Sequence, residues 1–150
     1  MQDEFLDLLD AAIYKEIASE ALYLAAKKKT RDPGASALME ELAAEEKKHS
    51  QWLKEFKDKR ATQKWHRGVV PNLRISEYLT SADTLEGAGL QDTLVFAMKK
   101  EQQAVDFYSR MTGLFRGNSA KSLCRKLVNE EMRHKLKLEV LYDGLFLVED

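Results

Sequence analysis

The 150-residue sequence contains few of the residues that interrupt helices or cross-link chains: two prolines, seven glycines and one cysteine. The single cysteine, Cys124, excludes an internal disulfide and any metal cluster held by several cysteines of this chain. Such low cysteine use is typical of a reducing compartment. Proline and glycine are both unfavourable in helix interiors, so their scarcity favours long helices. We therefore expect an all-α protein located in the cytoplasm.

Three further features are absent. No apolar run is long enough to span a bilayer, and residues 1–4 (MQDE) are acidic where a secretory signal would be basic and then apolar. No concentrated basic block occurs, and the 24 Lys and Arg residues are balanced by 25 Asp and Glu residues. We therefore expect neither a membrane nor a nucleic acid as a partner. The 44% hydrophobic content indicates a folded, globular chain.

The few glycines and prolines cluster, and they divide the chain into four long segments. In the first segment, apolar residues follow a helical period at Leu9, Ile13, Ile17 and Leu24. We predict helices at about 3–29, 33–60, 90–114 and 118–142.

Capping residues mark two of the helix starts. Asp32 is expected to cap the second helix, with Pro33 as its first helical residue. Asn118 or Ser119 is expected to cap the fourth helix.

The remaining segments are predicted to be a long crossover at about 61–89, with a short helical turn near 75–79, and a tail at 143–150. The tail is expected to pack on the bundle or on a partner chain, because it contains Leu145, Phe146 and Leu147.

The chain contains an internal repeat. Residues 7–53 placed over residues 92–138, an offset of 85 without gaps, match at fourteen of 47 positions. Two copies of one helical hairpin, at about 3–60 and about 90–142, therefore form a single domain over residues 1–150. A two-fold axis across the bundle would make the second and third helices parallel. Their crossover would then run the length of the bundle, roughly 40 Å for helices of about 25 residues.

Acidic residues and histidines interrupt the apolar stripe of each helix. The stripes of the second and fourth helices are Leu38, Leu42, Glu46, His49, Leu53 and Leu123, Leu127, Glu131, His134, Leu138. The first and third helices carry the matching sets Leu9, Ile13, Glu16, Tyr23 and Leu94, Met98, Glu101, Tyr108. Four carboxylates and two imidazoles should therefore point at one interior.

Two divalent cations would neutralise this interior. Buried carboxylates without partners are very costly, four of them repel one another, and no Lys or Arg lies on the same stripes. Dimetal bundles use one Glu from each of two helices and Glu-x-x-His from each of the other two. Oxygen and imidazole donors together favour iron or manganese, with zinc able to bind in vitro. The sequence thus predicts a dimetal site held by Glu16, Glu46, His49, Glu101, Glu131 and His134.

Other interpretations of these residues were weighed. A single Glu-x-x-His on a helix usually lies on the surface, but two copies within the same leucine frame favour a metal site. The third histidine, His66, has no acidic residue three positions before it and no repeat partner. Glu45 and Glu130 also repeat, and the stripes place them in more exposed positions or beside the ligands. Glu20 is rejected because its repeat partner is Val105.

Tyr23 and Tyr108 lie about two helical turns from Glu16 and Glu101. They are either ordinary core aromatics or donors of a phenol hydrogen bond that orients a ligand carboxylate.

Cys124 is expected to be a buried helix residue rather than a nucleophile. Trp52 and Trp65 are expected to serve packing or an interface.

With these residues in place, the sequence resembles the rubrerythrin branch of the ferritin-like superfamily. The matching elements are Glu16 with Tyr23, Glu46-Lys47-Lys48-His49, Glu101 with Tyr108, and Glu131-Met132-Arg133-His134. The resemblance implies a ferritin-like four-helix bundle that holds two non-haem iron ions. It also implies reduction of hydrogen peroxide or dioxygen, or oxidation of ferrous iron. It is compatible with a homodimer, for which the sequence identifies no interface.

Two features depart from typical rubrerythrins. Those proteins append a rubredoxin domain with paired Cys-x-x-Cys motifs, whereas this chain has one cysteine, so a separate electron-donor protein is expected. They also carry an extra Glu three residues after the third-helix ligand, where this chain has Ala104, with Ser19 as its repeat partner. This difference puts the peroxidase-type exchange of ligands in question and predicts a more symmetric site.

The sequence leaves three functions open. We favour a diiron oxidoreductase that acts on peroxide or dioxygen. The first alternative is a ferroxidase, or a protein of iron handling or storage. The second is a structural helical bundle that keeps a relic of a metal site.

Overall fold

The computed structural model describes residues 3–60, 87–115 and 117–147. Within these ranges the chain forms four helices: α1 (Asp3–Lys27), α2 (Pro33–Arg60), α4 (Leu90–Leu114) and α5 (Asn118–Phe146). None of these helices is apolar over a length that could cross a bilayer. The predicted helical turn at 75–79, Trp65 and His66 lie outside the described residues.

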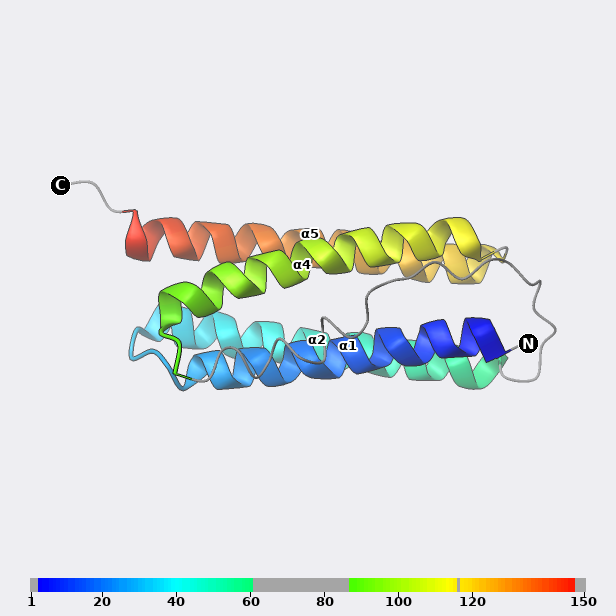
Figure 1. Cartoon of the computed structure of the whole chain (residues 1–150), viewed down its shortest axis with the longest axis horizontal. Coiled ribbons are helices and arrows are strands. Elements are labelled where there is room, and N and C mark those ends of the chain that lie inside the picture. The colour runs from blue at the N-terminus through cyan, green and yellow to red at the C-terminus, as the bar shows by residue number, and fades with distance from the viewer. Residues whose placement is uncertain (1–2, 61–86, 116, 148–150) are drawn as a thin grey trace.

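The helices form two antiparallel hairpins that pack on each other (Figure 1). α1 packs along α2 and α4 packs along α5, while α1 contacts α4 and α2 contacts α5 between the hairpins. α2 and α4 run in the same direction, so the end of α2 and the start of α4 lie at opposite ends of the bundle (Figure 1). The prediction of an all-α bundle built from two hairpins, with a long crossover between the second and third helices, is confirmed.

A side chain caps the start of α2, as predicted, whereas the start of α5 differs from its prediction. The backbone N–H of Ala35 donates a hydrogen bond of 2.8 Å to Oδ2 of Asp32, which satisfies one of the free amide groups of the first turn. The predicted cap at Asn118 or Ser119 is wrong. The cap residue of α5 is Gly117, in an extended conformation, and no side chain hydrogen-bonds to that end.

α5 is also longer than predicted. It ends at Phe146 rather than near residue 142. The ring of Phe146 packs against the apolar cluster at that end of the bundle and lies 5.2 Å from the ring of Tyr142. Burial of this ring outweighs the low helix propensity of Gly144 two residues earlier. The first part of the predicted tail therefore packs on the bundle as helix, while Leu147 is exposed.

The buried apolar residues form two clusters, one toward each end of the bundle. The first, near the start of α1 and the end of α4, includes Leu9, Leu53, Phe107, Met111, Phe115 and Leu127. The second, near the end of α1 and the start of α4, includes Met39, Leu42, Leu94, Ala97 and Leu138. The middle of the bundle lies between these clusters.

Ile17 and Leu24 do not belong to the core, so this part of the predicted period is wrong. Their side chains are 43% and 46% exposed. The buried face of α1 instead runs through Leu9, Ile13 and Glu16. Because each residue turns the helix by about 100°, Ile17 lies off the face that Glu16 occupies.

An apolar row on α5, spaced by four residues, is exposed at Met132, Leu136 and Val140. The expected homodimer stays a prediction.

Leu42 is completely buried on α2, as is its repeat partner Leu127 on α5. We expect Leu42→Ala to lower the free energy of unfolding of the metal-free protein by about 2–5 kcal/mol, because it leaves a cavity in the core. Leu136→Ala, at a residue 60% exposed on α5, is the matched control, with an expected change of about 0.5 kcal/mol or less. Urea unfolding followed by circular dichroism measures both. Equal effects of the two substitutions would contradict the core described above.

Candidate metal centre

The six predicted ligands lie together in the middle of the bundle. They are Glu16 on α1, Glu46 and His49 on α2, Glu101 on α4, and Glu131 and His134 on α5. All six side chains are buried, and none is more than 2% exposed. Each hairpin of the repeat contributes the same set of two Glu and one His, so the cluster follows the two-fold arrangement of the hairpins.

Their donor atoms fall into two overlapping groups, and within each group one ligand atom per residue lies within 4.8 Å of the others. One group is Glu16, Glu46, His49 and Glu131, and the other is Glu46, Glu101, Glu131 and His134. Two carboxylates, Glu46 and Glu131, belong to both groups. This arrangement could hold two ions that share two carboxylates.

The closest contacts within the cluster join the two hairpins. Nδ1 of His134 lies 2.7 Å from Oε1 of Glu46, and Nδ1 of His49 lies 3.0 Å from Oε1 of Glu131. The two imidazole rings are nearly parallel, with centroids 5.5 Å apart and an interplanar angle of 9°. Both rings therefore present Nδ1 to the carboxylates.

Burial and mutual repulsion change the acidity of the carboxyl groups. Burial, reinforced by the charges of Glu131 and Glu16, holds the pKa of Glu46 well above its ordinary value. Burial and the charge of Glu131 raise the pKa of Glu101 to about 8. Burial acts in the same direction on Glu16, but hydrogen bonds with Glu46 and His49 outweigh it and lower the pKa of Glu16 to about 2. Without metal, the cluster therefore keeps protons on part of its carboxyl groups at neutral pH.

The two histidines are protonated in the same environment. Burial alone would lower the pKa of His49, but hydrogen bonds with Glu131 and Glu16 raise it to about 10. Burial likewise opposes protonation of His134, and interactions with Glu101 and Glu131 raise its pKa to about 9. Protons therefore balance the carboxylates in the metal-free protein, and a bound metal ion would have to displace them.

Hydrogen bonding within the cluster is incomplete, which fits a metal. Each of the six side chains has at least one buried polar atom without a well-formed hydrogen bond. These atoms are Oε2 of Glu16, both carboxylate oxygens of Glu46, Nδ1 of His49, Oε2 of Glu101, Oε1 of Glu131 and Nδ1 of His134. Buried polar atoms in folded proteins are nearly always paired. Carboxylate oxygen and imidazole nitrogen are also ligands suited to iron, manganese and zinc.

Two tyrosine hydroxyls hydrogen-bond to this cluster across the hairpins. Tyr23 donates to Oε1 of Glu101, and Tyr108 donates to Oε1 of Glu16 at 2.5 Å. Burial raises the pKa of both phenols well above the ordinary value, so both remain neutral donors. Because each phenol occupies one oxygen of its carboxylate, Oε2 of Glu16 and Oε2 of Glu101 are left available.

Lys15 is a residue near the centre that the apolar stripes did not reveal. Its side chain is 5% exposed, and Nζ lies 4.8 Å from the ring centroid of Tyr108 and 5.1 Å from that of Phe107. Burial lowers the pKa of Lys15, whereas the charge of Glu16 opposes this effect. Lys15 is not part of the apolar stripe of α1, yet it lies near enough to Glu16 for their charges to interact. Its recurrence in the repeat was the available signal.

Glu45 and Glu130 are half-buried at the edge of the cluster. The carboxylate of Glu45 contacts Nε2 of His134, the ring nitrogen that faces away from the other carboxylates. The carboxylate of Glu130 lies 3.6 Å from a guanidinium nitrogen of Arg133. Glu45 therefore interacts with a proposed ligand directly, and its repeat partner pairs with an arginine.

Cys124 is buried, and burial raises the pKa of its thiol to about 12, which disfavours a reactive thiolate. Ala104, at the position of the extra Glu of typical rubrerythrins, is buried in the apolar cluster around Phe107.

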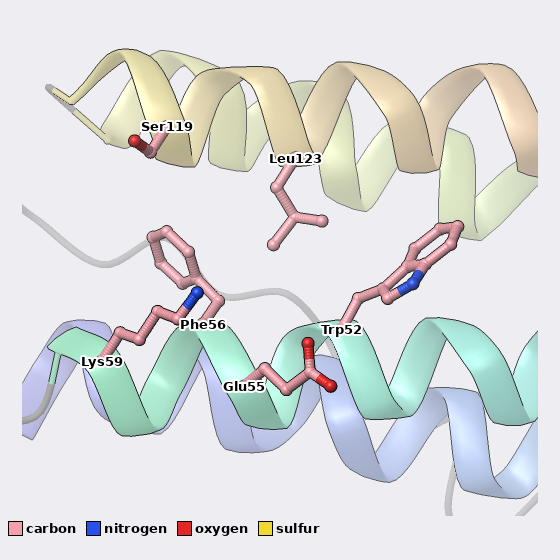
Figure 2. Close-up of a pocket in the computed structure, with 6 residues that line it drawn as sticks. All are labelled: Trp52, Glu55, Phe56, Lys59, Ser119 and Leu123. Carbon is pink, nitrogen blue, oxygen red and sulfur yellow. The ribbon is translucent and has the colours of Figure 1, made fainter.

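A surface pocket of about 260 Å³ lies between α2 and α5 and is lined by Trp52, Glu55, Phe56, Lys59, Ser119 and Leu123 (Figure 2). Trp52 connects this pocket to the centre, because its ring centroid lies 5.2 Å from that of His49. Nζ of Lys126 lies 3.9 Å from the same Trp52 ring and Nζ of Lys48 lies 5.9 Å from it. Trp52 therefore packs against His49 on one side and faces the surface on the other.

Two helical hairpins around a buried set of carboxylates and imidazoles define a ferritin-like four-helix bundle. Residues 7–142 match the family model described as rubrerythrin, so the chain belongs to the rubrerythrin family. Among curated proteins, no sequence match is found.

Several solved structures share the fold of this chain. A hypothetical protein from Pyrococcus furiosus is 23% identical with a TM-score of 0.75, over 97% of this chain and 92% of that one. A dodecameric thioferritin, the bacterioferritin-related protein of Bacteroides fragilis, is 15% identical with a TM-score of 0.70, over 97% and 88%. A two-domain protein from Anabaena variabilis with DJ-1/ThiJ/PfpI-like and ferritin-like domains is 16% identical with a TM-score of 0.75. The alignment covers 99% of this chain and 42% of that protein.

Substitution of Glu46 tests whether the cluster binds metal. We expect Glu46→Gln to leave the metal-free protein as stable as the parent or more stable, since it removes a buried carboxyl group whose ionised form is disfavoured by burial. The same substitution should abolish stabilisation by metal, which amounts to about 2.7 kcal/mol when the metal concentration is 100 times its dissociation constant. Thermal unfolding with and without ferrous iron under anaerobic conditions measures both effects. Glu41→Gln, at an exposed carboxylate of α2, is the control. An undiminished metal effect in Glu46→Gln would contradict the role of this residue.

Proposed function

We propose that this centre binds two iron ions, with Glu46 and Glu131 shared between them. Glu16 and His49 would complete one position, and Glu101 and His134 would complete the other. The observation that carries the proposal is the set of buried carboxylate and imidazole atoms without well-formed hydrogen bonds. Two divalent cations would match the four negative charges of the carboxylates once the protons are displaced. Manganese and zinc suit the same donors and are the alternatives to test.

When bound, iron supplies one-electron redox chemistry and Lewis acidity. The protein would contribute geometry and a dry environment. Tyr23 and Tyr108 would hold the two outer carboxylates in one orientation, through hydrogen bonds from opposite hairpins. The apolar clusters on both sides would limit the access of water to the centre.

The activity we propose is reduction of hydrogen peroxide or dioxygen by the reduced centre. Electrons would come from a separate donor protein, because a single cysteine cannot supply the cysteine-rich centre that typical rubrerythrins append. Family membership and the symmetric set of carboxylates and imidazoles support this proposal.

Iron handling, as a ferroxidase or a storage protein, is the second candidate. One observation favours it: Glu45, Glu130 and His134 form a further group whose ligand atoms lie within 4.8 Å, and the two carboxylates are partly exposed. Such an acidic group at the edge of the centre would attract ferrous ions from solution.

Anaerobic reconstitution with ferrous iron, followed by addition of peroxide, tests the proposal and separates these two candidates. We expect two ions per chain and rapid appearance of ferric absorption, followed by repeated turnover when a reductant is supplied. Aerobic loading far beyond two ions per chain would instead favour storage.

The test variant and its control each replace one carboxylate on α2 and one on α5. Glu46→Ala with Glu131→Ala should abolish binding. Glu41→Ala with Glu139→Ala, at carboxylates 49% and 43% exposed on the same two helices, should not. Binding that survives in the first pair would leave a structural bundle with a relic site as the better description.

A further inference from the structure

The six proposed ligands follow the two-fold arrangement of the repeat, but the residues around them do not. We propose that the two metal positions are inequivalent: the position at His134 fills first and binds more tightly, and Glu45 is the positioning residue that makes it so. This inference rests on the proposed function, because it concerns the same centre.

Glu45 contacts the outer nitrogen of His134. Nδ1 of His134 faces the cluster, 2.7 Å from Glu46, while Nε2 contacts the carboxylate of Glu45. A histidine that donates its outer N–H to a carboxylate is fixed in orientation and in tautomer, and it becomes a stronger electron donor to a metal on its other nitrogen. Glu45 therefore holds Nδ1 of His134 ready for a cation.

His49 lacks the equivalent arrangement. Within the described residues, the ion pairs of His49 all involve Nδ1, on the side of the cluster. Glu130, the repeat partner of Glu45, lies near Arg133 and groups with Glu45 and His134 rather than with His49. The ring of His49 packs instead against Trp52, which lines the surface pocket (Figure 2). Among residues 3–60, 87–115 and 117–147, no carboxylate therefore orients His49 in the way that Glu45 orients His134.

The lysines near the centre also differ between its two halves. Lys15 is buried beside Glu16 and rests over the ring of Tyr108, whose hydroxyl donates to that carboxylate. Its repeat partner, Lys100, is half-buried and lies 5.2 Å from the ring of Phe96, a residue on the preceding turn of α4. The environment of Glu16 therefore differs from that of its repeat partner Glu101.

The consequence is that the two metal positions fill in a fixed order. The first ion would occupy Glu101 and His134 with the shared carboxylates, and the second would occupy Glu16 and His49. The second ion would exchange more readily, on the side of the centre where Trp52 separates His49 from the surface pocket.

Titration of the metal-free protein with cobalt(II), followed by its visible absorption and by calorimetry, tests this inference. We expect two ions per chain in two resolved steps that differ by about tenfold or more in affinity. Glu45→Gln should weaken the first step by about 10–100-fold, which is the usual effect of removing a carboxylate partner of a metal-bound histidine. Glu41→Gln removes the same charge from a carboxylate of the same helix that is 49% exposed, and it should change neither step by more than about threefold.

The order of filling is read independently with one equivalent of cobalt. The absorption spectrum should be preserved in His49→Gln and altered in His134→Gln. Two steps of equal affinity, equal weakening by Glu45→Gln and Glu41→Gln, or a spectrum altered in His49→Gln instead, would overturn the inequivalence while leaving the dimetal centre intact. Absence of cobalt binding in the parent protein would overturn the proposed function together with this inference.

Discussion

The cost of burying charge inside a helical bundle is the constraint on which the rest of this structure depends. Four carboxylates and two imidazoles lie in the middle of the bundle, with apolar clusters on both sides. In the metal-free protein, protons retained on Glu46, Glu101, His49 and His134 limit this cost, as their raised pKa values indicate. Several buried donor atoms still lack hydrogen bonds. An apolar core of the same volume would be at least as stable, so the arrangement is best explained by a ligand that these atoms bind.

The duplicated hairpin explains how such a cluster can assemble. Four of its contacts join the two hairpins: Tyr23 with Glu101, Tyr108 with Glu16, His134 with Glu46, and His49 with Glu131. Neither hairpin completes the set alone, so formation of the centre and packing of the hairpins depend on each other. Metal affinity would then contribute directly to the stability of the fold. The shared ligands obey the two-fold repeat, whereas Lys15, Glu45 and Trp52 distinguish its two halves.

Much of the fold could be predicted from the sequence, because the repeat and the Leu-Leu-Glu-His-Leu frame are long-range patterns that a single substitution does not erase. Burial of Glu46, His49, Glu131 and His134 follows from that frame, and burial of Glu16 and Glu101 follows from the matching stripes of the other two helices. Features decided by local competition were not predictable: Gly117 rather than Asn118 precedes α5, and α5 continues to Phe146 because that ring finds a place against the core. The contacts of Lys15 and Glu45 depend on how side chains from different helices meet, which helical periodicity does not report. Residues 61–86 lie outside the described ranges, so the path of the crossover stays a prediction.

The most direct test of the central claim is a crystal structure of the protein reconstituted anaerobically with ferrous iron, with anomalous diffraction measured on both sides of the iron absorption edge. The account predicts two iron peaks inside the bundle, both next to Glu46 and Glu131, with Nδ1 of His49 at one peak and Nδ1 of His134 at the other. A bundle of unchanged fold with no iron peak between these residues, or with iron bound only at surface carboxylates, would contradict it.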